Sequence, residues 1–185
     1  MATQAALGSA KRLQELYKER AIMFGDFALA SGKKSKYYLD SKKIMLRGDA
    51  LFAYANFVER IMCVEQLHFD TVGGPETGAI PLAAAIAVRG VYENIESFYI
   101  RKQPKGHGST NVIEGIIKPG AKVLLVEDVV TTGNSVLRAA KIVEEAGGEI
   151  VKIIAIVDRL EGASKNLQGY NYKPILTVAD LGIEV

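Results

Sequence analysis

Two adjacent carboxylates, Glu127 and Asp128, directly follow a short apolar run, Val123–Val126. The run predicts a buried strand with both carboxylates at its end. The pair would repel a phosphate group. Its expected partners are therefore sugar hydroxyls, which donate hydrogen bonds to carboxylates, or a divalent cation.

The segment after the acidic pair is rich in groups that bind phosphate. Gly133 lets the backbone approach a ligand closely, and a helical pattern begins at Asn134, where backbone N–H groups and the helix dipole favour an anion. Hydroxyl side chains stand beside these donors at Thr131, Thr132 and Ser135. A phosphate-binding loop next to carboxylates that bind sugar hydroxyls indicates a ribose phosphate as the ligand. The alternative is that Thr, Asn or Ser only caps the helix and that the acidic pair lies in a solvated turn.

The segment Val123–Ser135 resembles the phosphoribosyl pyrophosphate (PRPP) signature of the type I phosphoribosyltransferases. The resemblance rests on the apolar strand, the acidic pair and the threonine-glycine loop. It implies that the acidic pair holds the ribose 2- and 3-hydroxyls, that Asp128 is catalytic, and that the loop wraps the 5-phosphate. The PRPP-binding residues implied here are Glu127, Asp128, Val129, Val130, Thr131, Thr132, Gly133, Asn134 and Ser135.

The segment between Ala21 and Asp40 has the pattern of a β-hairpin. An apolar run and the returning strand Tyr37–Leu39 flank a polar turn, Ser31–Ser35. A surface turn with solvated lysines is the alternative. The residue pattern from Phe27 to Asp40 resembles the N-terminal signature of the orotate phosphoribosyltransferases, in which the hairpin forms a hood over the base. The resemblance implies that Tyr37 and Tyr38 line the orotate pocket.

The segment Arg101–Thr110 interleaves three cations and a histidine with two glycines and a proline. This composition predicts a basic loop that is neither helix nor strand, and a solvated loop without function is the alternative. The pattern Arg-Lys-x-x-Lys-x-His-Gly resembles the catalytic loop of the orotate phosphoribosyltransferases. It implies that the loop closes on pyrophosphate as a lid. The residues implied are Arg101, Lys102, Lys105 and His107, with Lys105 and His107 catalytic.

Arg159 follows the β-branched run Ile150–Val157 and Asp158. In an open parallel sheet the carboxyl ends of the strands line the ligand crevice, so Arg159 is placed to meet an anionic substrate. A surface ion pair with Asp158 is the alternative. The family resemblance implies that Arg159 contacts orotate, together with Thr131.

Alternating strand and helix patterns begin at about Asp49 and must position these residues. They predict an α/β fold: a doubly wound, mainly parallel sheet of the type I phosphoribosyltransferase kind, with a small N-terminal β hood. The glycine-rich loop Gly73–Gly78 is either a plain turn or, by the resemblance, the pyrophosphate loop. The predicted helices are Ser9–Arg20, Asp49–Leu67, Ile80–Val88 and Asn134–Ala146; the predicted strands are Phe69–Val72, Ser97–Arg101, Val123–Val126, Ile150–Val157 and Ile175–Val178.

Length and composition limit the function classes. With 185 residues and 49% hydrophobic content, we expect one domain over residues 1–185, with residues from about 20 to 45 forming the hood. A net charge of +2 without a clustered basic face argues against a nucleic-acid partner. The absence of a signal-peptide pattern and of any membrane-length apolar run predicts a cytoplasmic protein with no membrane contact. The single cysteine, Cys63, is expected to be buried.

The resemblance implies transfer of a phosphoribosyl group from PRPP to orotate, giving orotidine 5-phosphate and pyrophosphate. It also implies Mg²⁺ held mainly by substrate and water, with no direct protein ligand, and a homodimer with shared active sites. Two alternatives stay open. One is another PRPP-dependent base phosphoribosyltransferase, and the other is a non-catalytic regulator that senses PRPP.

Overall fold

The computed structural model describes residues 2–28, 34–89, 95–104 and 111–184. Within them the chain alternates between helices and strands. In chain order the elements are α1 Ala2–Arg20, β1 Ile22–Ala28, β2 Lys34–Leu39, α2 Lys42–Met45, α3 Gly48–Val64, β3 Thr71–Pro75, α4 Ala79–Ala87, β4 Glu96–Ile100, β5 Ile113–Gly115, β6 Lys122–Val130, α5 Asn134–Glu145, β7 Glu149–Asp158, α6 Ala163–Asn166 and β8 Tyr172–Thr177.

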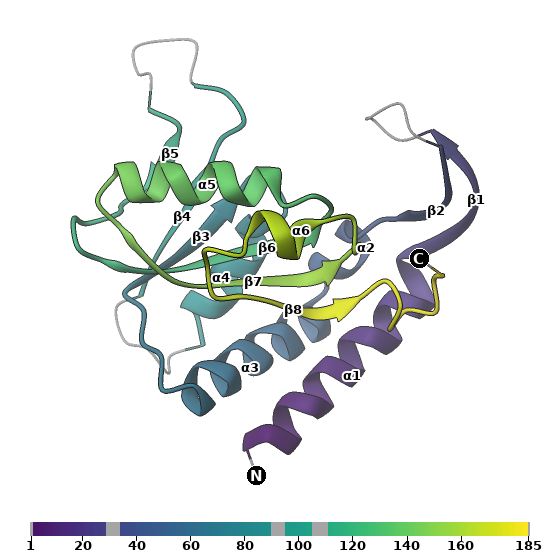
Figure 1. Ribbon diagram of the computed structural model, residues 1–185. Coiled ribbons are helices and arrows are strands. Elements are labelled where there is room, and N and C mark those ends of the chain that lie inside the picture. Colours follow the sequence, from purple (N-terminus) through teal and green to yellow (C-terminus); the bar gives the residue numbers. More distant parts are fainter. Residues whose placement is uncertain (1, 29–33, 90–94, 105–110, 185) are drawn as a thin grey trace.

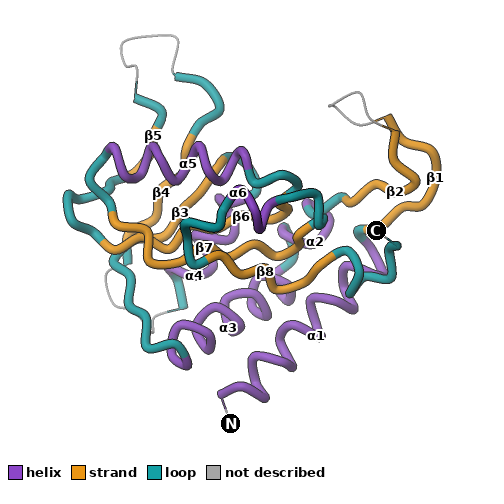
Figure 2. The backbone as a smooth tube through the Cα atoms, in the orientation of Figure 1, coloured by secondary structure: helices purple, strands orange, loops and turns teal. Residues whose placement is uncertain are grey.

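The strands form two separate sheets. The larger sheet has six strands in the order β5-β4-β3-β6-β7-β8, and all neighbours are parallel except β4 and β5. The smaller sheet is the antiparallel pair β1 and β2, which extends away from the larger sheet as the predicted hairpin (Figure 2).

Helices cover both faces of the larger sheet (Figure 1). On one face α1, α3 and α4 pack against side chains such as Leu124 and Val126 of β6. On the other face α5 and α6 pack against Val123 and Leu125 of the same strand. Successive residues of β6 thus supply two cores, because strand side chains alternate between faces. The architecture confirms the predicted α/β, doubly wound, mainly parallel sheet.

Two strands extend well beyond their predicted carboxyl ends, and β8 begins at Tyr172, three residues before its predicted start. The strand β6 does not end before the acidic pair but continues to Val130, because Val129 and Val130 still pair with β7. The strand β3 continues through Gly73 and Gly74, which were expected to lie in a loop. A Cβ atom at Gly73 would lie 2.3 Å from the carbonyl oxygen of Phe98, so close packing between strands accounts for the glycine.

Further differences concern short or weakly patterned elements. Helix α1 begins at Ala2, because an alanine-rich segment continues the helix toward the N-terminus and buries Ala6 against α3. Helix α2 and the antiparallel edge strand β5 were not predicted at all. The thiol-bearing Cys63 is exposed on α3 instead of buried. Among the described residues, no helix is both long and apolar enough to cross a membrane.

Candidate active site

The carboxyl ends of β3, β4 and β6 border a cavity of about 280 Å³. From β3 the chain moves outward to β4 and β5, whereas from β6 it moves outward to β7 and β8. A crevice at such a reversal of strand order is the usual ligand site of an open α/β sheet. The lining residues are Lys42, Pro75, Glu76, Thr77, Gly78, Ile100, Lys102, Glu127, Asp128, Val129, Ser135, Arg138 and Ala139.

Both carboxylates of the acidic pair line this cavity. Glu127 is only 7% exposed, and its Oε1 accepts a hydrogen bond from the backbone N–H of Asp128 at 3.2 Å. Burial, followed by the charge of Asp128, raises the pKa of Glu127, and the positive charge of Lys102 opposes the shift. Ionised Glu127 is therefore costly in this buried position. A ligand that brings hydroxyl donors or a cation would relieve this cost.

The carboxylate of Asp128 is held on three sides. Its Oδ1 accepts a hydrogen bond from the N–H of Val129 at 2.8 Å, and its Oδ2 contacts the hydroxyl of Ser41. Gly78, at the end of the glycine-rich loop, lies so close that a Cβ atom there would be 2.3 Å from Oδ1. The loop is therefore more than a plain turn. Ser41 was not predicted as a site residue, and Gly78 was considered only as part of a possible pyrophosphate loop.

The loop between β6 and α5 has the shape expected of an anion site. Gly133 adopts a φ of 83° in the left-handed region, which favours glycine. Asn166 fixes the loop by donating from Nδ2 to the carbonyl oxygen of Thr132 at 2.8 Å. Within this described segment no side chain caps α5, so its first backbone N–H groups are available to a ligand.

The residues predicted for the phosphate loop contribute unequally. Val129 and Ser135 line the cavity, whereas the side chain of Val130 is buried in the core beneath α5. Thr131 and Thr132 are half-buried, Gly133 is buried and Asn134 is exposed. Val130 and Gly133 can therefore serve a ligand only through their backbone groups.

Of the described residues predicted for the lid, Lys102 lines the cavity. Its N–H donates to Glu76 Oε1 at 2.8 Å, and its carbonyl oxygen accepts from Arg138 at 3.2 Å. The guanidinium of Arg101 instead faces Glu114, at 3.5 Å. The predicted catalytic residues Lys105 and His107 lie outside the described residues. The start of the predicted lid is thus fixed by the β3–α4 loop and by α5.

The hairpin places Tyr37 against Arg159, and the family resemblance assigns both residues to the orotate pocket. The guanidinium carbon of Arg159 lies 4.8 Å from the centre of the Tyr37 ring, and Nε donates to the Tyr37 hydroxyl at 3.1 Å. Nε also faces Glu161 Oε1 at 3.1 Å. The ion pair of Arg159 is therefore with Glu161, whereas the alternative raised from the sequence named Asp158 as the partner. Tyr38 points to the other face of β2 and packs against Phe27, with ring centres 5.7 Å apart.

A strained turn after β7 presents Arg159. Leu160 has a φ of 59°, and its N–H is bound by Asp158 Oδ1 at 2.7 Å. The other oxygen of Asp158 accepts from the Tyr172 hydroxyl at 3.0 Å, and burial followed by the charge of Asp158 raises the pKa of Tyr172. The backbone N–H of Arg159 also donates to the carbonyl oxygen of Val130 at 2.9 Å. Arg159 is thereby anchored beside the end of β6.

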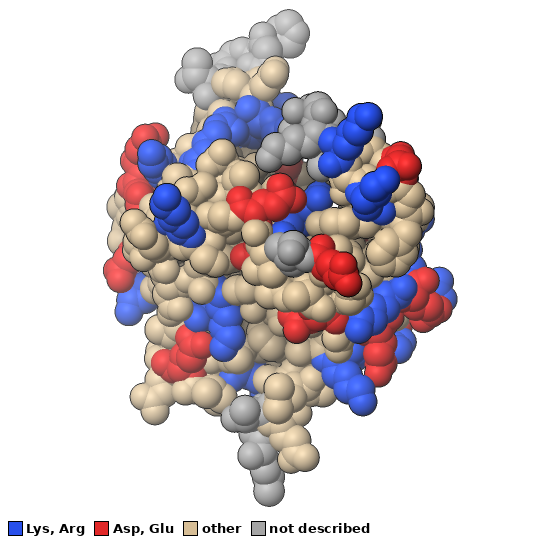
Figure 3. All heavy atoms as spheres, turned by 45° about the vertical axis from the view of Figure 1, so that its right-hand side comes forward, with Lys and Arg blue, Asp and Glu red and all other residues tan. Residues whose placement is uncertain are grey.

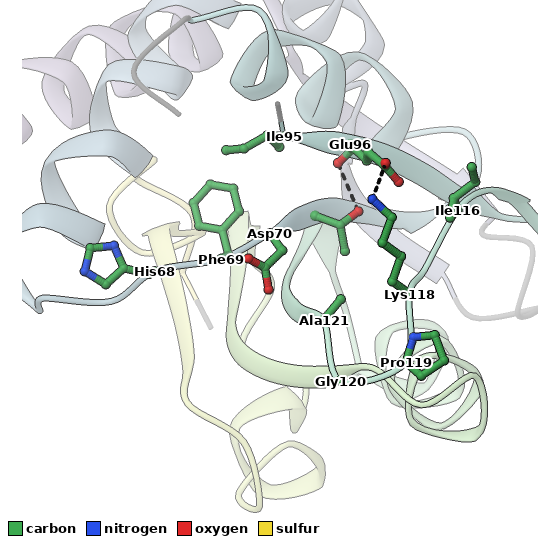
Figure 4. A pocket seen from close by; sticks show the side chains of 11 residues that line it. His68, Phe69, Asp70, Ile95, Glu96, Ile116, Lys118, Pro119, Gly120 and Ala121 are labelled. Carbon is green, nitrogen blue, oxygen red and sulfur yellow. Dashed lines mark hydrogen bonds and ion pairs between the residues drawn. The ribbon is translucent and has the colours of Figure 1, made fainter. Parts of the chain in front are cut away.

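A larger cavity, of about 630 Å³, lies at the opposite, amino ends of β3, β4 and β6 (Figure 4). Its main polar groups bind one another: Lys118 faces Glu96 at 2.9 Å, and the Thr71 hydroxyl donates to the Glu96 carbonyl oxygen at 2.9 Å. None of the predicted site residues lines it. Size alone therefore does not identify the functional site.

Charges of both signs are interspersed on the face seen in Figure 3. The cavity repeats this mixture, because cationic Lys42, Lys102 and Arg138 surround the acidic pair. Opposite charges this close suit a ligand that carries both phosphate and hydroxyl groups.

The donor set fits a metal ion that arrives with its substrate. Among the described residues, no group of three or more His, Cys, Asp or Glu side chains is arranged to hold a metal ion. Two adjacent carboxylates alone do not make the cage of oxygen ligands that Ca²⁺ sites use. They do suit Mg²⁺, which keeps several waters and is bound through one or two carboxylates and substrate phosphates.

Comparison with known proteins agrees with this geometry. Residues 54–173 match the family model of the phosphoribosyl transferase domain. The chain is 44% identical over 171 residues to orotate phosphoribosyltransferase of Pyrococcus furiosus, covering 91% of this chain and 92% of that relative. It is 42% identical over 173 residues to the enzyme of the same name from Methanocaldococcus jannaschii, covering 92% and 95% of the two chains.

Solved structures give the same result for the fold. A crystal structure of Mycobacterium tuberculosis orotate phosphoribosyltransferase in complex with PRPP superimposes with a TM-score of 0.79 at 32% sequence identity. The match covers 95% of this chain and 99% of that one.

Proposed function

This chain belongs to the phosphoribosyl transferase domain family as an orotate phosphoribosyltransferase, and on that premise we propose a role for each part of the site. The enzyme transfers a phosphoribosyl group from PRPP to orotate. We propose that PRPP binds in the cavity at the carboxyl ends of β3, β4 and β6. The observation that carries this proposal is the acidic pair, which lies in that cavity beside the uncapped start of α5.

The ribose and its 5-phosphate occupy adjacent parts of the cavity. Glu127 and Asp128 accept hydrogen bonds from the 2- and 3-hydroxyls, which relieves the cost of the buried charge on Glu127. The loop from Val129 to Ser135 and the first N–H groups of α5 receive the 5-phosphate. Asp128 then stabilises the positive charge that develops on the ribose ring as the bond to pyrophosphate lengthens.

The leaving pyrophosphate lies between the β3–α4 loop and Lys102. Lys102 neutralises its negative charge, and the predicted lid adds the cations of Arg101, Lys105 and His107. Closure of the lid excludes water, so each of these contacts acts in a medium of lower dielectric constant.

Orotate binds where the hairpin meets Arg159. The planar guanidinium donates to carboxylate and carbonyl oxygens in pairs, and orotate presents both groups. Tyr37 lies against the same guanidinium. Thr131 is a further predicted orotate contact, whereas Tyr38, predicted for the same pocket, packs against Phe27 on the other face of β2. Residues 1–185 act as one domain with the hairpin as its hood.

We propose that Mg²⁺ accompanies PRPP and is held mainly by substrate oxygens and water. When bound, it neutralises pyrophosphate charge. Glu127 and Asp128 line the cavity in which we place this complex. The reaction is expected in the cytoplasm, which agrees with a chain that contains a single cysteine.

A homodimer with shared sites is the proposed assembly. Ile80, Ala84 and Val88 are exposed along one face of α4, at a spacing of four residues. Phe52 of α3 is 58% exposed and is contacted by Arg89, which directly follows the C-cap of α4. Because α4 starts at the cavity, a second subunit packed on this apolar face would bring its own lid close to the site.

Mixing two inactive variants tests the shared site. We expect Lys105→Ala subunits and Asp128→Asn subunits, each inactive alone, to recover activity after subunit exchange. If the lid acts on the partner, a mixed dimer combines both lesions in one site and leaves the other site intact. Random exchange makes about half of the dimers mixed, so roughly a quarter of wild-type activity should return.

A lid that acts within its own subunit gives a different result, because every site then keeps one lesion and no activity returns. Subunit exchange must be verified separately, for example by native mass spectrometry of differently tagged subunits. Verified exchange without recovery excludes the shared site.

Substrate choice separates this enzyme from the alternatives raised by the sequence. We expect purified protein with PRPP and Mg²⁺ to release pyrophosphate when orotate is present and not with uracil or hypoxanthine, because only orotate offers a carboxylate to Arg159. Pyrophosphate release is followed by a coupled assay. Release with uracil or hypoxanthine at a comparable rate would place the chain among other base phosphoribosyltransferases, and no release would favour a PRPP-sensing protein.

A further inference from the structure

Ser41 joins the hood to the acidic pair. It lies between the end of β2 and the start of α2, and its hydroxyl donates to Asp128 Oδ2. A serine at the start of a helix ordinarily uses its hydroxyl to cap that helix's own N–H groups. Here Ser41 makes no such capping bond. Its hydroxyl is directed instead at a carboxylate 87 residues away in the sequence.

The position of Ser41 is fixed by its surroundings. It is 6% exposed, and its carbonyl oxygen accepts hydrogen bonds from the N–H groups of Ile44 at 2.9 Å and Met45 at 2.8 Å. Ile44 and Met45 are themselves buried, and the Tyr17 hydroxyl contacts the sulfur of Met45 at 3.7 Å. A hydroxyl on such a rigid base restricts the side chain that it binds.

Asp128 needs this restraint because a second carboxylate lies next to it. The N–H of Val129 holds Oδ1 at 2.8 Å, and the Ser41 hydroxyl holds Oδ2. Two donors on different oxygens determine the plane of the carboxylate. The remaining acceptor directions of both oxygens are then left for a ligand in the cavity.

We propose that Ser41 is a positioning residue for the phosphoribosyl transfer, which orients Asp128 for the ribose hydroxyls. The proposal rests on the assignment of Asp128 to the ribose given above. A hydrogen bond to a charged group typically changes an equilibrium by roughly ten- to a hundredfold. Ser41→Ala should therefore lower kcat/KM for PRPP by that factor.

The conservative and matched variants separate positioning from packing. Ser41→Thr keeps the hydroxyl and should restore kcat/KM for PRPP to within about threefold of wild type. Thr71→Val is the control: it removes a buried hydroxyl that binds the Glu96 carbonyl oxygen at the opposite end of the sheet, with little change of shape. It should match any loss of thermal stability in Ser41→Ala and leave kcat/KM unchanged.

The KM for orotate shows whether the hood has moved. If Ser41→Ala simply displaced β2, Tyr37 would move with it and the KM for orotate would rise as much as that for PRPP. Positioning of Asp128 predicts a loss confined to PRPP and kcat. An equal rise of both KM values overturns the proposal.

A double-mutant cycle on PRPP binding tests whether Ser41 acts through Asp128. The dissociation constant of PRPP with Mg²⁺ is measured by calorimetry for wild type, Ser41→Ala, Asp128→Asn and the double variant. We expect Ser41→Ala to weaken PRPP in the wild-type background and to have almost no effect beside Asp128→Asn. The same effect in both backgrounds, or no effect in either, overturns the proposal.

The cycle also separates this inference from the assignment on which it rests. If Asp128→Asn alone leaves PRPP affinity unchanged, the ribose assignment itself is wrong. If Asp128→Asn weakens PRPP and Ser41→Ala does not, only the role of Ser41 is wrong. Should Ser41→Ala fold poorly, Ser41→Cys keeps the volume with a weaker donor and is expected to give an intermediate loss.

Discussion

Asp128→Asn is expected to abolish turnover, with a loss in kcat of roughly a thousandfold. The amide keeps the size of the side chain and an oxygen that can accept from Val129, but it removes the negative charge that we propose stabilises the ribose. Because this charge stabilises the transition state more than the bound substrate, kcat should fall more than PRPP affinity. Orotate-dependent release of pyrophosphate measures the loss.

The matched control is the neighbouring carboxylate. Burial raises the pKa of Glu127, so its charge is already disfavoured and Glu127→Gln should cost less activity than Asp128→Asn. Thermal unfolding of both variants should stay close to that of wild type, because an amide can occupy either position. Wild-type turnover in Asp128→Asn would disprove its role at the ribose.

Arg159→Ala is expected to raise the KM for orotate by roughly ten- to a hundredfold and to leave the KM for PRPP within about threefold. Only the base loses its cationic partner, because the guanidinium lies against Tyr37 and not in the cavity of the acidic pair. Steady-state kinetics with each substrate varied in turn give the two KM values.

Two further variants sharpen this result. Arg159→Lys keeps the charge without the planar pair of donors, so it should recover only part of the orotate affinity. Glu161→Gln leaves the guanidinium in place and removes the carboxylate that faces it at 3.1 Å. It should not weaken orotate. Equal losses for orotate and PRPP in Arg159→Ala would place this residue elsewhere in the reaction.

The sequence revealed those parts of the site that depend on neighbouring residues. The order of strand, acidic pair, glycine and helix is local, so the cradle from Val123 to Ser135 could be predicted with its helix start. The strand boundary was wrong by four residues, because Val129 and Val130 belong to a ladder whose partner lies in β7. A pairing partner is not visible in a local pattern.

Contacts between distant segments explain what the sequence did not reveal. Ser41 and Gly78 reach Asp128 only because α2 and the β3–α4 loop fold onto β6. The sequence also treated Tyr37 and Tyr38 alike. Strand alternation sends one ring to Arg159 and the other to Phe27, and the direction depends on how the hairpin sits on the sheet.

A buried charge inside β7 is another feature whose partners the local sequence does not reveal. Lys152 interrupts an otherwise apolar run and is 1% exposed. Its ammonium group forms an ion pair with Glu65 at 2.6 Å and donates a hydrogen bond to Asn171 Oδ1 at 3.0 Å. Both partners lie far away in the sequence, so the apolar run could be read as a buried strand only by disregarding this lysine.

The order of strands in the larger sheet also determines when the site forms during folding. β3 and β6 are neighbours in the sheet although they lie far apart in the sequence. Because Thr71 pairs with Val123, their ladder closes a long loop at a considerable entropic cost. The cavity lies across that ladder. A nascent chain that ends before β6 therefore lacks the proposed PRPP site entirely. Because a ligand that binds only the native state shifts the folding equilibrium toward that state, PRPP bound at this proposed site would stabilise the newly made enzyme.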